Sequence, residues 1–444
     1  MVDQTISVYY HGQEAAVMSY DEDKLLGYFE YTPEFITQNI ELAPLKMPLV
    51  KGKIYSFANI NPETFRGLPG LVADSLPDKF GTSVLNQWVA RQGRSKPINV
   101  IERLQYTGTR GMGALEYRPS KQLKKLNASA VVDLEILTEL AQSIVTNRQK
   151  INVPLSSNQS AEPDAMKTLL AVGTSAGGAR PKAVLAFNQD FTEARSGQVN
   201  APVGFSHYLM KFDGVTEQNQ NQETFGDPLG YGVMEYVYYL MATDCGIDME
   251  RCSLINEGSR RHFVTKRFDR DGNNKIHTQT LTGIAHVDYN TPGSYSYEEL
   301  FATARKLKLS LHDAKQLYLR MAFNMISRNN DDHSKNFSFI YRNNRWQLAP
   351  AYDMAYCYKP NNAWVERHWM SANAKRINHN RKDLIAVGQN MTKLPLPELH
   401  QMIDKVLESV SQWSFLAKQH EVPDTLRKEI TGHLLLKDFI KKNK

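Results

Sequence analysis

The chain has 444 residues, of which 41% are hydrophobic and 23% are charged, the balance of a globular protein with two or three domains. Its net charge of +6 suits anionic partners such as a nucleotide, a tRNA-bound enzyme or DNA, but it selects none of them. Three cysteines without CxxC spacing argue against a disulfide framework and a cysteine zinc site. The most apolar stretch, 231–242, is too short to span a bilayer.

Residues 1–120 are predicted to form a strand-rich small domain. Residues 6–10 form a strand-like run that closes at His11-Gly12, and residues 78–89 are compatible with a helix. A helical pattern follows at 131–147, and the polar segment at 152–163 is predicted to be a linker. We therefore assign 121–165 to a connecting helix and linker.

Residues 166–420 are predicted to form a second, larger domain. Strands are expected at 183–187, 207–212 and 261–268, a helix at 232–245 between the second and third strands, and a polar loop at 213–227. Beyond 296 the pattern is mostly helical. A capping box at 310–313 begins a helix that runs to about 327. A hairpin follows, with strands at 337–341 and 346–349 and a turn at 342–344. The basic segment 421–444 is expected to be a terminal helix or tail.

These elements predict an α+β fold with two lobes. Strands dominate the N-lobe, up to about residue 270, and helices dominate the C-lobe after it. A polar loop and a hairpin at the junction of a strand-rich half and a helical half are the layout of a bilobal protein-kinase-like fold.

The strongest chemical signal is NDDHSKN at 330–336, followed beyond the hairpin by AYD at 351–353. Phosphoryl transfer needs a carboxylate that orients the acceptor hydroxyl, and Asn and Asp oxygens that hold Mg²⁺ against the phosphates. Asp331, Asn336 and Asp353 have the spacing that protein kinases use for these roles. A polar turn, in which Asp and Asn bond their own backbone, is the alternative. The combination of loop, hairpin and second Asp favours the kinase.

Two further features support a nucleotide site. In TSAGGARPK at 174–182, small residues would let backbone amides approach phosphate oxygens, and Arg180 or Lys182 would add charge. By itself this segment could equally be a tight turn, and it is not a Walker A loop. Lys211 lies in a predicted strand and Glu235 on the following helix, as a kinase requires for a phosphate-binding lysine held by a carboxylate. A solvated strand-end lysine is the alternative.

The segments TSAGGARPK, YLMKF, TKRFDRDG, NDDHSKNFS and PAYDM, in this order and at these intervals, resemble the HipA family of serine/threonine kinases. The resemblance covers nearly the whole chain. It is carried by motifs at about 165–420. It is looser in the small domain, where GLVADSLPD at 70–78 and TRGMGAL at 109–115 look like the family's counterparts.

The resemblance implies roles for individual residues. Asp331 would be the catalytic base, and His333 would order the catalytic loop. Ser175 would be autophosphorylated, with Thr174 as the alternative acceptor. The stretch 265–268 would be the hinge whose backbone meets the adenine edge. The implied ATP site comprises Ser175, Ala176, Gly177, Gly178, Lys182, Lys211, Glu235, Lys266, Arg267, Phe268, Asp331, Asn336 and Asp353, with Asn336 and Asp353 as the Mg²⁺ ligands.

The sequence also departs from the family pattern. Asp332 stands where a glycine is usual, and Arg180 with Pro181 replaces the commoner acidic and amide residues. The extra carboxylate of Asp332 could tune Mg²⁺ affinity or point to solvent.

The resemblance further implies a cytoplasmic toxin that phosphorylates an aminoacyl-tRNA synthetase, glutamyl-tRNA synthetase in the best-known branch, and so halts translation. It implies restraint by autophosphorylation and by a DNA-binding helix-turn-helix antitoxin of the HipB type. DNA contact would come mainly through that partner, and no membrane contact is expected. The alternatives are a catalytically weak kinase-fold corepressor, and a kinase of another protein or of a small molecule.

Overall fold

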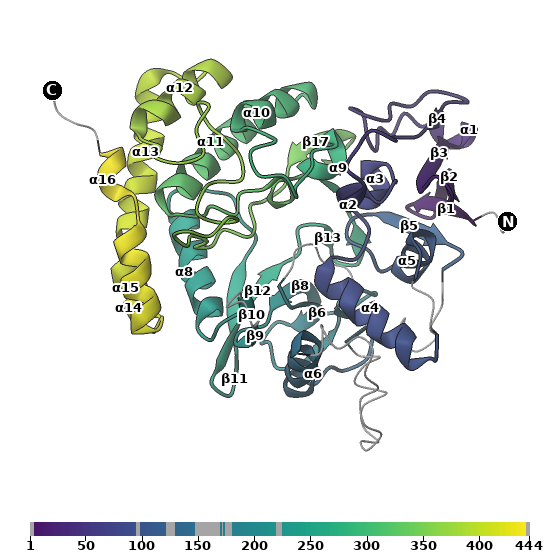
Figure 1. Cartoon of the computed structure of the whole chain (residues 1–444), viewed down its shortest axis with the longest axis horizontal. Helices are drawn as coiled ribbons and strands as arrows, with labels where there is room; N and C mark the ends of the chain where they lie inside the picture. Colours follow the sequence, from purple (N-terminus) through teal and green to yellow (C-terminus); the bar gives the residue numbers. More distant parts are fainter. Residues whose placement is uncertain are drawn as a thin grey trace.

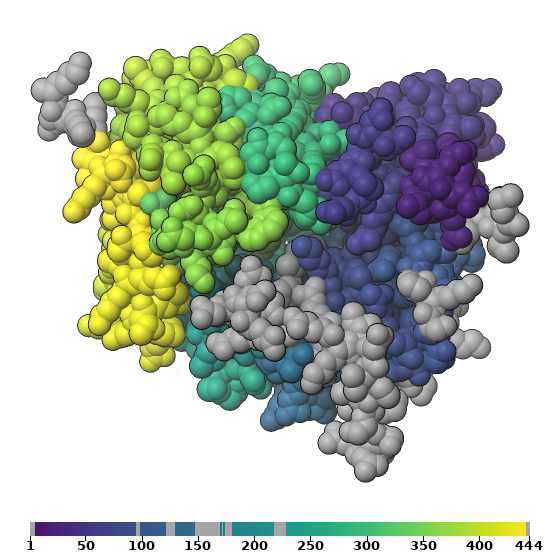
Figure 2. Space-filling view, viewed as in Figure 1, coloured from purple at the N-terminus to yellow at the C-terminus, as the bar shows by residue number. Residues whose placement is uncertain are grey.

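The computed structural model describes residues 4–94, 98–120, 129–146, 169–170, 172–173, 180–218 and 224–440. An N-terminal small domain, a strand-rich N-lobe and a helical C-lobe lie against one another (Figure 1). The small domain and the terminal helices occupy opposite ends of the face shown in Figure 2. The structure therefore confirms the predicted α+β class, strand-rich at its beginning and helical at its end.

The small domain is built on an antiparallel five-stranded sheet with the order β4-β3-β2-β1-β5. The predicted strand at 6–10 belongs to β1. His11 and Gly12 both have positive φ, of 46° and 81°, which allows the tight turn into the next strand. The strands are β1 (Gln4–Tyr10), β2 (Gln13–Asp21), β3 (Leu26–Tyr31), β4 (Ile54–Tyr55) and β5 (Leu115–Arg118).

Helices connect these strands. The predicted helix at 78–89 is α4 (Lys79–Arg91), whose N-cap Asp78 accepts a hydrogen bond from the Gly81 amide at 2.5 Å. Four other helices were not predicted from the sequence, and three of them have only four residues and so give little periodicity. They are α1 (Pro33–Ile36), α2 (Pro62–Phe65), α3 (Gly70–Ala73) and α5 (Val100–Thr107).

The N-lobe is a second five-stranded antiparallel sheet, with the order β11-β12-β8-β6-β7. Its strands are β6 (Lys182–Asn188), β7 (Ala194–Ser196), β8 (Phe205–Lys211), β11 (Cys252–Glu257) and β12 (Arg260–Lys266), and its helices are α6 (Leu134–Thr146) and α8 (Tyr231–Asp244). In the register of β6 and β8, Lys182 lies directly opposite Lys211. The two lysines therefore share one face of the sheet.

Two predictions in this lobe need correction. The segment 213–227, expected to be a loop, contains paired strands β9 (Val215–Gln218) and β10 (Thr224–Asp227). Polar residues can form a hairpin because the ladder bonds come from the backbone. The strand expected to reach 268 ends at Lys266, and Arg267 and Phe268 follow it outside the sheet.

The C-lobe contains the predicted helical half. Ser310 and Asp313 form the expected capping box at the start of α11, with Ser327 as C-cap. The expected hairpin is also present, but its turn has two central residues, Asn343 and Asn344, with φ of 53° and 56°. The helices are α9 (Leu281–Ala285), α10 (Tyr297–Lys306), α11 (Leu311–Ile326), α12 (Arg381–Met391), α13 (Leu396–Ser411), α14 (Trp413–Gln419), α15 (Asp424–His433) and α16 (Leu436–Phe439).

Short elements lie where the lobes meet. The hairpin strands β16 (Ser338–Arg342) and β17 (Arg345–Leu348) pair with β15 (His277–Thr280) in a three-stranded sheet. The short strands β13 (Arg270–Asp271) and β14 (Asn274–Lys275) pair just after the N-lobe sheet, and the 3₁₀ turn η1 (Ser334–Asn336) precedes β16. These elements connect the two lobes at the candidate site.

The core has three main clusters of buried apolar side chains, one centred on each part of the molecule, and the buried side chains of α8 belong to the C-lobe cluster. The apolar face of α4, which includes Phe80, Val84 and Leu85, belongs to the N-lobe cluster. The small domain and the N-lobe are therefore packed together by a shared core. No helix in the described ranges is long and apolar enough to cross a membrane.

Candidate functional site

Two adjoining pockets lie where the three parts of the chain meet. The inner pocket, of about 1250 Å³, reaches the apolar side chains of β8, β12 and residues 351–352. The outer cleft, of about 2120 Å³, lies between the small domain and the C-lobe. The two pockets share some of their lining residues, which are Leu76, Lys182, Lys211, His333, Lys335, Asn336 and Asp353. Five of the residues that the sequence singled out, Lys182, Lys211, His333, Asn336 and Asp353, therefore line the junction of the two pockets.

The centre of this junction is an ion triad in which Lys211 and Glu235 are buried and Asp353 is partly exposed. Lys211 Nζ lies 2.5 Å from Glu235 Oε1 and 2.6 Å from Asp353 Oδ1, and the Lys211 side chain is 6% exposed. Burial opposes the charge on Lys211, but Asp353 and Glu235 outweigh it and raise the pKa of the ammonium group. For Asp353 burial is likewise outweighed, by Lys211 and Lys182, which hold the pKa of its carboxyl below the usual range. The triad therefore keeps a charged lysine beside an ionised carboxylate.

A second lysine extends the positive charge. Lys182, opposite Lys211 in the sheet, is 3% exposed, and burial lowers the pKa of its ammonium group despite the nearby Asp78 and Asp353 carboxylates. Arg180 lines the outer cleft. Three cations from two neighbouring segments thus surround the place where the pockets meet, which suits the oxygens of a polyphosphate.

Residues 331–336 stand on the outer side of this cluster. Asn336 Nδ2 donates to the Asp331 carbonyl at 2.7 Å, which closes the loop, and the Asn336 side chain lines both pockets. The Asp331 carboxylate lines only the outer cleft, 3.7 Å from His333 Nε2. Burial raises the pKa of Asp331, while His333 and Arg180 oppose that rise. The loop therefore presents a carboxylate to the cleft in which an acceptor could bind.

Asp332 is fully buried and faces away from both pockets. Its carboxylate accepts hydrogen bonds from Tyr297 Oη at 2.8 Å, from the Trp369 amide at 2.7 Å and from the Met370 amide at 3.4 Å, and it lies 3.0 Å from His368 Nδ1. Of the two uses suggested by the sequence, exposure to solvent is therefore wrong, whereas tuning of Mg²⁺ affinity stays a prediction. A buried carboxylate needs such partners, and here they hold residues 368–370 against the loop that carries Asp331.

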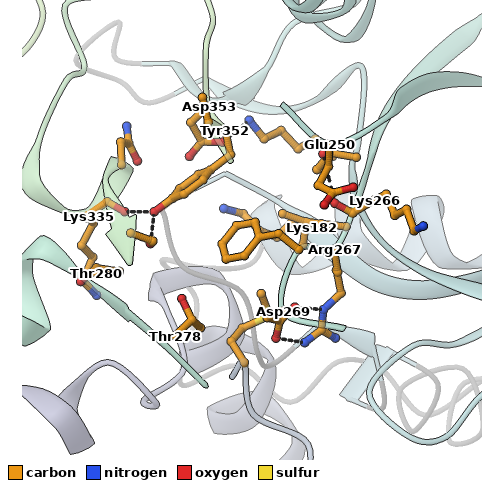
Figure 3. A pocket seen from close by; sticks show the side chains of 18 of the residues that line it. Lys182, Glu250, Lys266, Arg267, Asp269, Thr278, Thr280, Lys335, Tyr352 and Asp353 are labelled. Atoms are coloured by element: carbon orange, nitrogen blue, oxygen red, sulfur yellow. Dashed lines mark hydrogen bonds and ion pairs between the residues drawn. The ribbon is translucent and has the colours of Figure 1, made fainter. Parts of the chain in front are cut away.

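Residues 265–268, the predicted hinge, line the inner pocket. The amides of Lys266 and Arg267 donate to the carbonyls of Arg251 and His207, so neither is open to an adenine edge. The guanidinium of Arg267 is buried in an ion pair with Asp269 at 2.6 Å and 2.8 Å (Figure 3). Arg267 lines the inner pocket, but its amide and its guanidinium both have protein partners, so its assignment to nucleotide contact stays a prediction.

An aromatic pair lines the inner pocket beside the end of β12. The rings of Phe268 and Tyr352 stack with centroids 5.7 Å apart and planes 28° apart. Tyr352 Oη donates to the Lys335 carbonyl at 2.6 Å and lies 2.5 Å from Ser338 Oγ, contacts that Figure 3 shows. Flat apolar surface next to the cationic cluster suits a planar base attached to phosphates.

The small domain also contributes to the site, which was not predicted from the sequence. Asp74, Ser75, Leu76 and Met112 line the inner pocket. They lie within GLVADSLPD and TRGMGAL, the two segments that carried the resemblance in this domain. That resemblance was the signal in the sequence from which their place at the site could have been predicted. Lys335, within NDDHSKN, was also missed although it lines both pockets.

Some of the predicted residues lie beyond the described part of the chain. Ser175, Ala176, Gly177 and Gly178, with Thr174, are outside the described residues. Within the described ranges, no three His, Cys, Asp or Glu side chains are grouped to hold a metal. Mg²⁺ in kinases needs few protein ligands because substrate phosphates and water complete its shell. Asn336 and Asp353 line the same pockets with hard oxygen donors, so the residues fit such an ion.

Comparison with known proteins gives two family matches. Residues 174–414 match the family described as HipA-like C-terminal domain, and residues 6–118 match that of the HipA N-terminal domain. Over 96% of its length, the chain superposes on 94% of a chain from the Shewanella oneidensis MR-1 toxin–antitoxin complex of HipA, HipB and operator DNA. That match has a TM-score of 0.65 and 16% identity, a similarity of fold.

Two curated proteins are also similar. The toxin YjjJ of Escherichia coli K12 is 26% identical over 232 residues, which are 51% of this chain and 48% of that protein. A Haemophilus influenzae protein named as a candidate kinase is 29% identical over 160 residues, 32% of this chain and 46% of that protein. The chain thus spans about half the length of the curated relatives that it matches.

Proposed function

The chain belongs to the HipA family, and from that premise we propose that it is an ATP-dependent kinase acting on a serine or threonine hydroxyl of a protein. The observation that carries the proposal is the Lys211–Glu235–Asp353 triad at the junction of the two pockets. A strand lysine paired with a helix carboxylate, next to a carboxylate that can face a metal, is what phosphoryl transfer requires.

The side chains divide the reaction between the pockets. The base of ATP would occupy the inner pocket against Phe268 and Tyr352, and its phosphates would lie on Lys211 and Lys182. Asn336 and Asp353 would hold Mg²⁺, which supplies charge neutralisation for the phosphates. An acceptor hydroxyl in the outer cleft would give its proton to Asp331 while its oxygen attacks the γ-phosphorus. The bond between that phosphorus and the bridging oxygen breaks, and ADP leaves.

The test is Asp331→Asn. We expect the rate of phosphoryl transfer to fall by at least ~10²-fold, because the substrate hydroxyl loses the carboxylate that orients it and takes its proton. ATP affinity should change little, since Asp331 lines only the outer cleft. The measurements are transfer of labelled phosphate to bacterial lysate proteins and titration calorimetry with Mg-ATP. Wild-type turnover in the Asn variant would contradict the assignment.

The finer proposals rest on the family. An aminoacyl-tRNA synthetase, glutamyl-tRNA synthetase first, is the proposed substrate, and a helix-turn-helix antitoxin of the HipB type is the proposed partner through which DNA is contacted. The complex of the Shewanella oneidensis HipA with HipB and operator DNA supports the partner. Phosphorylation of purified synthetases, and copurification with the product of an adjacent short reading frame, test the two proposals separately. Transfer to other proteins only would overturn the first.

We propose in addition that Ser175 is autophosphorylated and that this modification inhibits the kinase. A phosphoserine brings about −1.5 to −2 charges, which would repel ATP phosphates and compete for Arg180 and Lys182. Peptide mass spectrometry after incubation with Mg-ATP should find phosphate on Ser175, and the phosphorylated protein should bind ATP more weakly. Phosphate on Thr174 alone, or unchanged affinity for ATP, would refute this proposal.

A further inference from the structure

An aromatic wall lines the outer cleft beside the catalytic loop. The rings of Trp364 and Trp369 stack with centroids 5.7 Å apart and planes only 19° apart. His333 stands edge-on to Trp369 at 5.8 Å and is 5.9 Å from Tyr289 on its other side. All four side chains line the outer cleft, and neither tryptophan lines the inner pocket.

The two indoles are unequally covered. Trp369 is 8% exposed, whereas Trp364 is 53% exposed although Trp369 covers one of its faces. The exposed part of Trp364 therefore includes its opposite face. A large aromatic surface left open in a cleft, on a rigid aromatic support, is typical of a binding surface rather than of a folding core.

This wall is fixed to the catalytic loop by buried hydrogen bonds. The Trp369 amide donates to Asp332 Oδ1 at 2.7 Å and lies 3.2 Å from the Asn330 carbonyl. Asn330 Nδ2 donates at 3.1 Å to the carbonyls of both Val365 and Glu366, which follow Trp364. Asn330 and Asp332 flank Asp331 in the sequence, so the residues that hold the wall also hold the proposed base. The position of Trp364 relative to Asp331 is thereby set.

We propose that Trp364 is a specificity-determining residue that binds a planar side chain in the acceptor segment of the protein substrate. This inference rests on the proposed kinase function. Aromatic rings and the guanidinium of arginine both stack on an exposed indole face, so the shared chemistry is a flat π or cationic group. The occupant is the acceptor segment because the hydroxyl must reach Asp331 in the same cleft.

Three variants test the proposal. Trp364→Leu keeps an apolar side chain but removes the flat face, and Trp364→Phe restores a smaller one. Phe415→Leu is the matched control, since Phe415 is 65% exposed on α14 and lines neither pocket. Each protein is incubated with Mg-ATP and a dephosphorylated bacterial lysate, and the phosphorylated sites are identified by mass spectrometry. Kinetics are then measured on the protein that the wild type phosphorylates most.

Sites used by the wild type should carry Phe, Tyr, Trp or Arg at a constant distance from the hydroxyl. For the best substrate, Trp364→Leu should raise KM about tenfold, the scale of one stacking contact, with little change in kcat. Trp364→Phe should recover most of the loss, and affinity for Mg-ATP should be unaffected. If only Arg occurs at the constant position, the group that binds Trp364 is a guanidinium. If only aromatic residues occur there, it is an aromatic ring.

The contrary results are separable. Unchanged sites and unchanged KM with Trp364→Leu, or equal losses in the Leu and Phe variants, would overturn this inference while leaving the kinase intact. The absence of transfer by the wild type to any lysate protein would overturn the proposed function itself, and this inference with it.

Discussion

Lys211 shows how one buried side chain defines the site. A buried ammonium group is unfavourable without partners, and here Glu235 from α8 and Asp353 from the C-lobe both lie within 2.6 Å of it. Asp353 has a positive φ of 54°, a conformation uncommon for a non-glycine residue and frequent at functional sites. The lysine thus joins the N-lobe sheet to the loop that follows the hairpin.

Asp353→Asn should weaken nucleotide binding as well as turnover. The substitution removes the charge of the proposed Mg²⁺ ligand. The same carboxylate is one of the two partners of Lys211. We expect calorimetry to show at least ~10-fold weaker binding of ATP with Mg²⁺, within the range typical of single changes at a metal site. Asp271→Asn, on an exposed carboxylate of β13, should have no effect. Equal affinity in the Asp353 variant would remove the metal role from this residue.

Among the elements, α3 of the small domain packs tightly against α9 of the C-lobe. A Cβ on Gly70 would lie 2.2 Å from the Gly283 carbonyl, and one on Gly283 would lie 2.1 Å from Asp74 Oδ2. The close approach allows Asp74 to accept hydrogen bonds from the Thr280 amide and hydroxyl at 2.7 and 2.8 Å. These glycines are required because any side chain would separate the two helices.

Gly283→Ala should therefore destabilise the protein by about 1–3 kcal/mol, the usual penalty for overpacking. The new methyl group must displace the carboxylate of Asp74. Gly432→Ala is the control. Gly432 lies within α15, and a methyl group added to it would have no neighbour within 4 Å, so this change should be neutral or stabilise by about 0.5–1 kcal/mol. Denaturant unfolding measures both, and equal effects of the two substitutions would refute the explanation.

For the whole molecule, His286 makes the same interface sensitive to pH. Its Nε2 accepts a hydrogen bond from the Gly70 amide at 3.0 Å, which requires a neutral ring. Burial, with a smaller contribution from Lys46, lowers the pKa of His286 to about 4 from its ordinary value of 6.5. Its contribution to stability is therefore complete above pH 6.5 and is lost as the pH falls from about 6.5 to 4.

His286→Gln should reduce the dependence of stability on pH, because glutamine can accept the same hydrogen bond and does not titrate. Between pH 7 and pH 5 the wild type should lose up to about 2 kcal/mol more than the variant, at about 1.4 kcal/mol per pH unit below 6.5. Denaturant unfolding at each pH measures the difference. His277, whose pKa is also lowered to about 4 by burial, remains in both proteins and cancels. Parallel curves for the two proteins would contradict this role of His286.

Much of the candidate site was contained in the sequence. Asp331 and Asn336 lie on one loop and Asp353 follows the hairpin after that loop, so local spacing determines their proximity. The capping box at Ser310 is a local signal too. Lys211 and Glu235 could be paired because a strand and the helix after it are neighbours in such a lobe. Each of these inferences depends on residues that are close in the chain or on a familiar connection.

The tertiary structure decided what depends on distant residues. Asp332 reads as a spare carboxylate until Tyr297, His368 and Trp369 are seen to hold it. The amide of Arg267 reads as open to a nucleotide until the carbonyl of His207, on β8, is seen to accept its hydrogen bond. The role of a polar group depends on whether it is buried and on which partners surround it. In this protein those partners come from segments whose spacing in the sequence carries no signal of their contact.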